Sequence, residues 1–162
     1  MDSIYLDNAA TTPVLPEVVE KMKEVLSSSF GNPSSIHSQG RTAKSLIENT
    51  RKSIAKELGA LSSEIIFTSG GTEGDNMGLQ GAVRGLGIQT IITSKIEHHA
   101  VIHAVENLEK SDHINVHYVQ VSSDGSPDMT DLERLLQHDD SKKLVSLMHV
   151  NNELGTICDL EA

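Results

Sequence analysis

Aromatic residues are scarce in this sequence: it has no tryptophan, two tyrosines and two phenylalanines among 162 residues. Its core must therefore be aliphatic, and with 37% hydrophobic and 22% charged residues the chain has the composition of a globular domain, not of a disordered segment. The single cysteine, Cys158, excludes an intrachain disulfide framework and suits a reducing compartment. No apolar run approaches the roughly 20 residues that a membrane span needs, and the acidic start is unlike a signal peptide. We predict a cytoplasmic protein.

Positive charge is also in short supply. Lysine and arginine together number 13 against 23 acidic residues, which gives a formal net charge of −10. This charge repels a phosphodiester backbone, and no local cluster of basic residues offsets it. Neither nucleic acid nor a membrane is expected as a partner.

Apolar periodicity predicts strands that alternate with helices. Four short apolar segments have the length of buried strands: 64–69, 90–94, 115–121 and 144–150. Helical patterns begin near Pro16, continue through a second helix closed by Gly59, and recur between the strands. This order predicts an α/β fold in which helices cover both faces of a mainly parallel sheet. The sheet is expected to be incomplete, because few residues follow the last strand.

Polar clusters follow three of these strands, where open parallel sheets bind ligands. After the first comes Gly70-Gly71-Thr72, where two glycines allow close backbone approach and a helix start presents free N–H groups. This arrangement suits a phosphate, although it matches neither the P-loop nor the dinucleotide fingerprint. A plain strand-to-helix turn is the alternative.

The second and fourth strands are followed by His98 and by Asn152. A histidine at a helix start tends to be neutral, and a neutral ring can stack on a cofactor or pass a proton. His99 and His103 have the spacing of helical zinc ligands, but no convincing third ligand accompanies them, so we predict no metal site. Asn152 can hydrogen-bond a ligand's ring substituents, or it can simply form a turn. Together the three clusters favour a ligand site.

Several long motifs resemble the cysteine desulfurases. They occur in the family's order and span essentially the whole chain: 5–13 (YLDNAATTP), 30–37 (FGNPSSIH), 66–73 (IFTSGGTE), 97–98 (EH) and 149–155 (HVNNELG). Their spacing resembles the iron–sulfur-assembly (NifS/IscS-like) branch of the class V aminotransferase superfamily more than the branch with longer insertions.

The resemblance implies the large domain of a fold-type-I pyridoxal-phosphate-dependent transferase, in part. Residues 1–15 would join the small domain and residues 16–162 would begin the cofactor-binding domain. Family members are homodimers that take sulfur from L-cysteine as a persulfide, release alanine, and pass the sulfur to iron–sulfur scaffold or other acceptor proteins. By resemblance, Gly71 and Thr72 hold the cofactor phosphate, His98 stacks on the ring and moves protons, and Asn152 contacts the side of the ring hydroxyl.

The family's later functional residues have no counterpart in these 162 residues. They are an aspartate that pairs with the pyridine nitrogen, further phosphate ligands, the Schiff-base lysine and the persulfide cysteine. Lys95 and Cys158 match neither covalent position, so we expect this chain alone to be inactive. Two alternatives remain open. One is another class V enzyme, such as a selenocysteine lyase or an aminotransferase, and the other is a truncated product that acts only by protein pairing.

Overall fold

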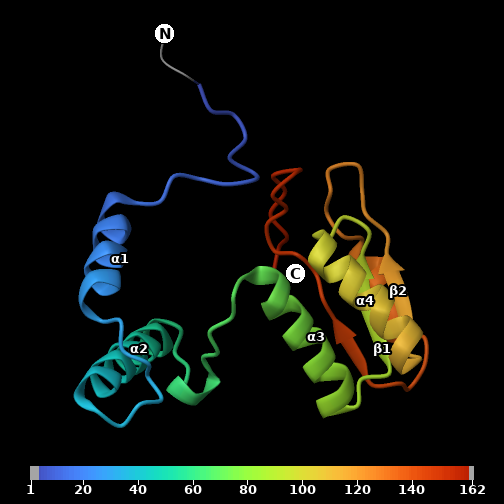
Figure 1. Ribbon diagram of the computed structural model, residues 1–162. Coiled ribbons are helices and arrows are strands. Elements are labelled where there is room, and N and C mark those ends of the chain that lie inside the picture. The colour runs from blue at the N-terminus through green and yellow to red at the C-terminus, as the bar shows by residue number, and fades with distance from the viewer. Residues whose placement is uncertain (1–3, 161–162) are drawn as a thin grey trace. The chain divides into compact units, whose positions relative to one another are not determined.

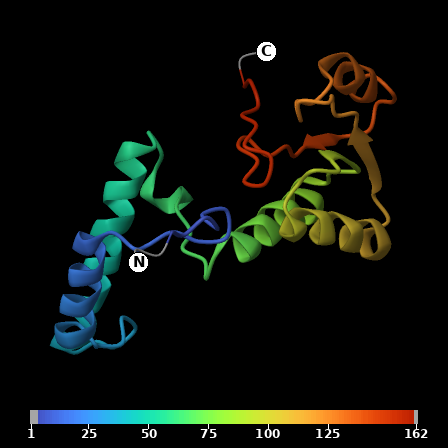
Figure 2. The ribbon, with the colours of Figure 1, turned by 90° about the horizontal axis from the view of Figure 1, so that it is seen from above.

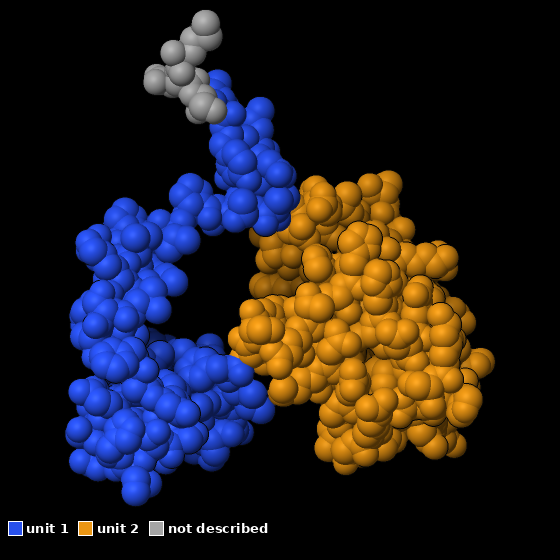
Figure 3. Space-filling model, in the orientation of Figure 1, with its two compact units in different colours: residues 1–67 blue, residues 68–162 orange. Residues whose placement is uncertain are grey.

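A computed structural model describes residues 4–160 of the protein, which divides into two compact units, Met1–Phe67 and Thr68–Ala162 (Figure 3). Each unit is described here by itself. Within residues 4–160, no helix is long and apolar enough to cross a membrane.

The first unit is helical. It contains α1 (Pro16–Ser28), α2 (Ser38–Glu57) and the short 3₁₀ helix η1 (Ser62–Glu64) (Figure 1). Pro16 opens α1, where its fixed φ suits a first turn and its missing N–H costs nothing. Gly59 ends α2 in the left-handed region at φ +64°, and the Ala60 N–H then reaches back to the Ala55 carbonyl at 2.9 Å. The predicted helix end at Gly59 is confirmed.

The predicted strand at 64–69 is wrong. Among the described residues this segment takes part in no strand pairing. Instead the Arg51 guanidinium of α2 donates to the Ile65 carbonyl and lies 4.7 Å from the centre of the Phe67 ring. The apolar run, which resembles a buried strand in sequence, therefore leaves Ile66 64% exposed.

The second unit is a three-layer α/β structure. Its elements are α3 (Gly71–Leu86), β1 (Thr90–Ser94), α4 (His99–Asp112), β2 (Asn115–Val119), α5 (Met129–Leu136) and β3 (Lys143–Val145). The three strands are parallel in the order β2-β1-β3, with Thr90 of β1 opposite Asn115 of β2 and Lys143 of β3. The prediction of a parallel sheet is confirmed, although its last strand is shorter than the expected 144–150.

Alternating side chains of β1 enter two separate cores. Ile91 packs with α3 and α4 on one face, and Ile92 packs with α5 on the other. Figure 2 shows this arrangement, with α5 and the pair α3 and α4 on opposite sides of the strands. All five residues of β1 are buried, and the segment consists of four β-branched residues followed by the small Ser94. Helices therefore cover both faces, as predicted.

Candidate functional site

The start of α3 presents free backbone donors. No described residue accepts a hydrogen bond from the N–H groups of Gly71, Thr72 or Glu73, and Gly74 is the first to bond within the helix, to the Gly70 carbonyl at 3.1 Å. The Glu73 carboxylate turns back to accept the Ser69 N–H at 2.6 Å, which lowers its pKa. A Cβ added at Gly71 would meet no atom within 4 Å, so the space before the helix is open. These features suit an anion such as a phosphate.

His98 follows β1 and caps α4. Its Nδ1 accepts a hydrogen bond from the Ala100 N–H at 3.1 Å, as an N-cap side chain does. Because an acceptor nitrogen carries no proton, the ring's proton lies on Nε2. The ring is otherwise exposed, so one nitrogen is held by the helix and the other is available to a ligand.

Asn151 and Asn152, which follow β3, have opposite environments. Asn151 is only 6% exposed, and its Oδ1 accepts the N–H groups of Glu153 and Leu154, each at 2.9 Å. Asn152 is exposed, and its Nδ2 donates weakly to the neighbouring Glu153 carboxylate at 3.3 Å. The buried amide therefore builds the turn, and the exposed amide is free to meet a ligand.

The structure brings two of the predicted groups together. His98 and Asn152 line one pocket of about 190 Å³, which is bounded mostly by polar side chains of the segments after β1 and β3. Gly71 and Thr72 do not line it. The pocket is also smaller than the roughly 300–1,000 Å³ of a typical small-molecule site. It can hold the ring end of a cofactor, whose phosphate would need a second anchor.

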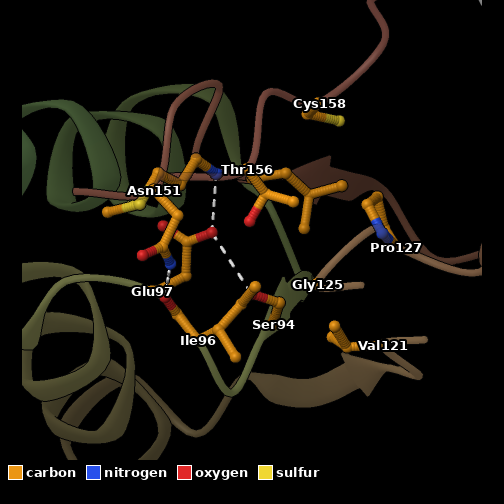
Figure 4. Close-up of a pocket in the computed structure, with 11 residues that line it drawn as sticks. Ser94, Ile96, Glu97, Val121, Gly125, Pro127, Asn151, Thr156 and Cys158 are labelled. Atoms are coloured by element: carbon orange, nitrogen blue, oxygen red, sulfur yellow. Dashed lines mark hydrogen bonds between the residues drawn. The ribbon is translucent and has the colours of Figure 1, made fainter. Parts of the chain in front are cut away.

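Glu97 and Asn151, which lie in the motifs at 97–98 and 149–155, connect these segments. The Glu97 Oε1 accepts the Met148 N–H at 2.6 Å, and the Asn151 Nδ2 donates to the Ile96 carbonyl at 2.8 Å (Figure 4). Both residues also line a second, smaller cavity of about 20 Å³ behind the pocket, a volume that suits a single water. Their position in these motifs, next to His98 and Asn152, could have indicated them in advance.

Of the remaining candidates His99 also lines this pocket, whereas His103, Lys95 and Cys158 are not among the described residues that line it. His99 and His103 lie one helical turn apart with ring centroids separated by 5.9 Å, and no third potential ligand joins them within residues 4–160. The Lys95 ammonium is 5.9 Å from the centre of the Tyr118 ring on β2. Cys158 is partly buried and lines the smaller cavity, where Figure 4 shows it beside Thr156. No lysine or cysteine is among the described residues that line the His98 pocket.

Burial raises the pKa of the Glu97 carboxyl, the Met148 and Ser94 hydrogen bonds lower it, and the charge of Asp75 on α3 raises it further. Three other titratable groups line the same pocket: His98, His99 and Glu153. A carboxyl whose pKa is raised by folding binds its proton more tightly in the folded state. The contribution of the protonated Glu97 carboxyl to the free energy of unfolding is therefore complete at pH values below its ordinary pKa of 4.5. This contribution is lost as the pH rises through the raised pKa.

We therefore expect Glu97→Gln to raise the free energy of unfolding at neutral pH, because glutamine keeps an acceptor oxygen for Met148 without burying a charge. Urea denaturation of both proteins between pH 4 and pH 7.5 measures this, with the exposed Glu109→Gln on α4 as a charge control. The gain should grow with pH and vanish near pH 4. Parallel pH profiles for wild type and variant would contradict the expectation.

Comparison with known proteins places this geometry in a family. The sequence pattern named Aminotransferase class-V matches residues 4–162. The cysteine desulfurase IscS of Dictyoglomus turgidum is 50% identical over 156 residues, which cover 95% of this chain and 39% of that protein. The cysteine desulfurase IscS of Methanosarcina thermophila is 46% identical over 158 residues, covering 96% of this chain and 38% of the relative. The chain thus spans about two fifths of the length of these relatives.

Solved structures agree in fold. A NifS-like protein superposes with a TM-score of 0.86 at 39% identity, over 95% of this chain and 42% of the other. The apo structure of a cysteine desulfurase from Thermococcus onnurineus gives 0.84 at 30% identity, over 98% and 39%. SspA, solved in complex with cysteine, gives 0.81 at 35% identity, over 93% and 43%. With a fold-type-I architecture and a sequence that matches from residue 4 onward, this chain belongs to the class V aminotransferase family.

Proposed function

We propose that this chain is the N-terminal, cofactor-binding portion of a pyridoxal-phosphate-dependent cysteine desulfurase. Its identity of up to 50% with proteins of that name supports the proposal, as does the structural similarity to a protein captured with cysteine. The observation that carries it is the shared pocket of His98 and Asn152 at the carboxyl end of the sheet. The substrate is L-cysteine, the products are alanine and a persulfide, and iron–sulfur scaffold or other sulfur-acceptor proteins receive the sulfur.

Each residue has a distinct role in this proposal. The Gly71 and Thr72 N–H groups bind the cofactor phosphate at the positive end of α3. His98 lies against the ring and moves a proton at Nε2, since its Nδ1 is held by Ala100. The Asn152 amide orients the ring through its hydroxyl. Pyridoxal phosphate, when bound, supplies the electron sink that stabilises negative charge on the substrate's α-carbon.

The proposal extends to the oligomeric state, the cellular location and the domain organisation of the whole protein. The whole protein acts as a homodimer in the cytoplasm, and residues 1–15 belong with its small domain. One supporting observation is that α1 contains no buried residue: within the described chain its apolar side chains Val18 and Met22 are 44% and 56% exposed.

The experiment is a binding titration with pyridoxine 5′-phosphate, which lacks the aldehyde and so cannot react with lysines. Gly71→Pro removes one N–H donor at the first helical position, where proline fits and the preceding Gly70 is extended. We expect it to weaken binding about tenfold, because a hydrogen bond to a charged group contributes roughly 1.5–3 kcal/mol.

Two controls separate the phosphate contact from other effects. Gly71→Ala adds a side chain but keeps the donor, and should bind like the wild type. Pyridoxine without phosphate should bind weakly and equally to all three proteins. If Gly71→Ala and Gly71→Pro lost affinity for pyridoxine 5′-phosphate equally, the assignment of the Gly71 N–H to the phosphate would be wrong. If the wild type bound pyridoxine and pyridoxine 5′-phosphate equally well, the proposed cofactor would be wrong.

A further inference from the structure

The segments that hold His98 and Asn152 extend beyond the sheet. Pairing between β1 and β3 ends at Ile92 and Val145, and the Ser146 N–H makes one last bond to the Ile92 carbonyl at 2.9 Å. Beyond this point no backbone–backbone hydrogen bond between residues 95–98 and 147–153 is present in the described chain. The pocket is therefore built on two loops that the sheet itself does not hold together.

Two side chains join these loops in opposite directions. The Glu97 carboxylate, on the loop after β1, accepts the backbone N–H of Met148 on the loop after β3 at 2.6 Å. The Asn151 amide, on the second loop, donates to the backbone carbonyl of Ile96 on the first at 2.8 Å. Each loop thus contributes one side chain that bonds to the backbone of the other loop. A hydrogen bond to a charged group, such as the first, is stronger than one between neutral groups.

Each of these residues directly precedes one of the two pocket groups. Glu97 is followed by His98, and Asn151 by Asn152. Asn151 is also fixed locally, because its N–H donates to the Thr156 carbonyl at 2.9 Å and its own carbonyl accepts the Gly155 N–H at 2.8 Å. Among the described residues Asn152 makes no hydrogen bond to the other loop, so its place in the pocket depends on its buried neighbour.

We propose that Glu97 and Asn151 are positioning residues that form a reciprocal clamp, which fixes the distance between His98 and Asn152 across the pocket. This rests on the proposed function, in which those two groups hold one flat ring between the loops. Misplacement of such groups by about 1 Å can cost a hundredfold in rate, so a clamp outside direct contact with the ring still controls its fit.

The test uses the 162-residue chain and matched substitutions. Glu97→Gln keeps the acceptor oxygen, and Glu97→Ala removes it. Ionised Asn151→Asp keeps the acceptor for the Glu153 and Leu154 N–H groups but cannot donate to Ile96, so it removes the bond between the loops and adds a charge at a buried position. Glu109→Gln, on the exposed face of α4, controls for lost charge.

The first readout needs no ligand. Hydrogen exchange at the Met148 amide should accelerate at least tenfold in Glu97→Ala and remain near the wild-type rate in Glu97→Gln. Nuclear magnetic resonance should show the Asn152 side-chain signals shift in Glu97→Ala and the His98 ring signals shift in Asn151→Asp. Among the described residues neither altered side chain is hydrogen-bonded to the group that reports the change, so these shifts measure coupling between the loops. Unchanged signals in both variants would overturn the clamp.

The second readout is affinity for pyridoxine 5′-phosphate. We expect Glu97→Ala and Asn151→Asp to weaken it about tenfold, and Glu97→Gln and Glu109→Gln to change it less than threefold. If the wild type did not bind pyridoxine 5′-phosphate, the proposed function would be wrong. The hydrogen-exchange and magnetic-resonance data would still show whether Glu97 and Asn151 hold the two loops together. Normal affinity in Glu97→Ala and Asn151→Asp would show that the clamp does not set the fit of the ring.

Discussion

Ile91→Ala is expected to lower the free energy of unfolding of the second unit by about 2–5 kcal/mol. Ile91 is 0% exposed at the centre of the middle strand and packs against both α3 and α4. Removing its side chain loses transfer free energy and leaves a cavity between two helices and a strand that cannot easily collapse. Small domains are stable by roughly 5–15 kcal/mol in total, so the loss is a large fraction of what holds the sheet.

Urea denaturation at pH 7 measures this change, with Ile91→Val as the graded variant at about 0.5–1.5 kcal/mol. The matched control is Leu86→Ala on α3, where the side chain is 63% exposed and the change should stay within about 0.5 kcal/mol. If Ile91→Ala and Leu86→Ala were equally mild, the core described around β1 would be wrong.

The second large effect is on turnover. We expect the purified 162-residue chain, supplied with pyridoxal phosphate and cysteine, to form alanine no faster than a mixture without protein. Covalent catalysis here needs an amine and a thiol at the site. The described residues that line the His98 pocket include neither, the Lys95 ammonium lies near Tyr118, and Cys158 lines the separate small cavity.

Amino-acid analysis of alanine measures this directly, with a full-length cysteine desulfurase assayed beside it to show that the assay responds. Lys95→Ala and Cys158→Ser serve as diagnostic variants. Turnover above the protein-free rate that disappears in either variant would assign a covalent role to that residue and reverse our interpretation.

Sequence patterns were most informative where burial was complete. The bounds of β1 were predicted correctly at Thr90–Ser94, because a strand buried on both faces must be apolar or small throughout. The last strand was predicted too long. The Met148 N–H, which a longer strand would pair with β1, goes instead to the Glu97 carboxylate, and that contact between distant segments leaves no local pattern.

The candidate site, like the sheet, could be predicted only in part. The rule that ligands lie beyond the carboxyl ends of parallel strands predicted His98 and Asn152 near one another, and both line one pocket. The same rule failed for the segment before Gly71, since residues 64–69 form no strand. Glu97 and Asn151 lie in the motifs at 97–98 and 149–155, but their contacts could not be predicted, because a carboxylate and an amide are common on loops and only coordinates show what they bond.

The strand order also has a consequence for synthesis on the ribosome. β1 is the first of the three described strands to be made and lies between the other two, so its second partner, β3, emerges only after α4, β2 and α5. Until then one edge of β1, whose five residues are all buried in the folded unit, lies open, and such edges invite pairing with other chains. A pause in translation while β3 is still inside the ribosome should therefore favour aggregation of this unit, and synonymous codons that slow elongation at that stage would lower its yield without changing a residue.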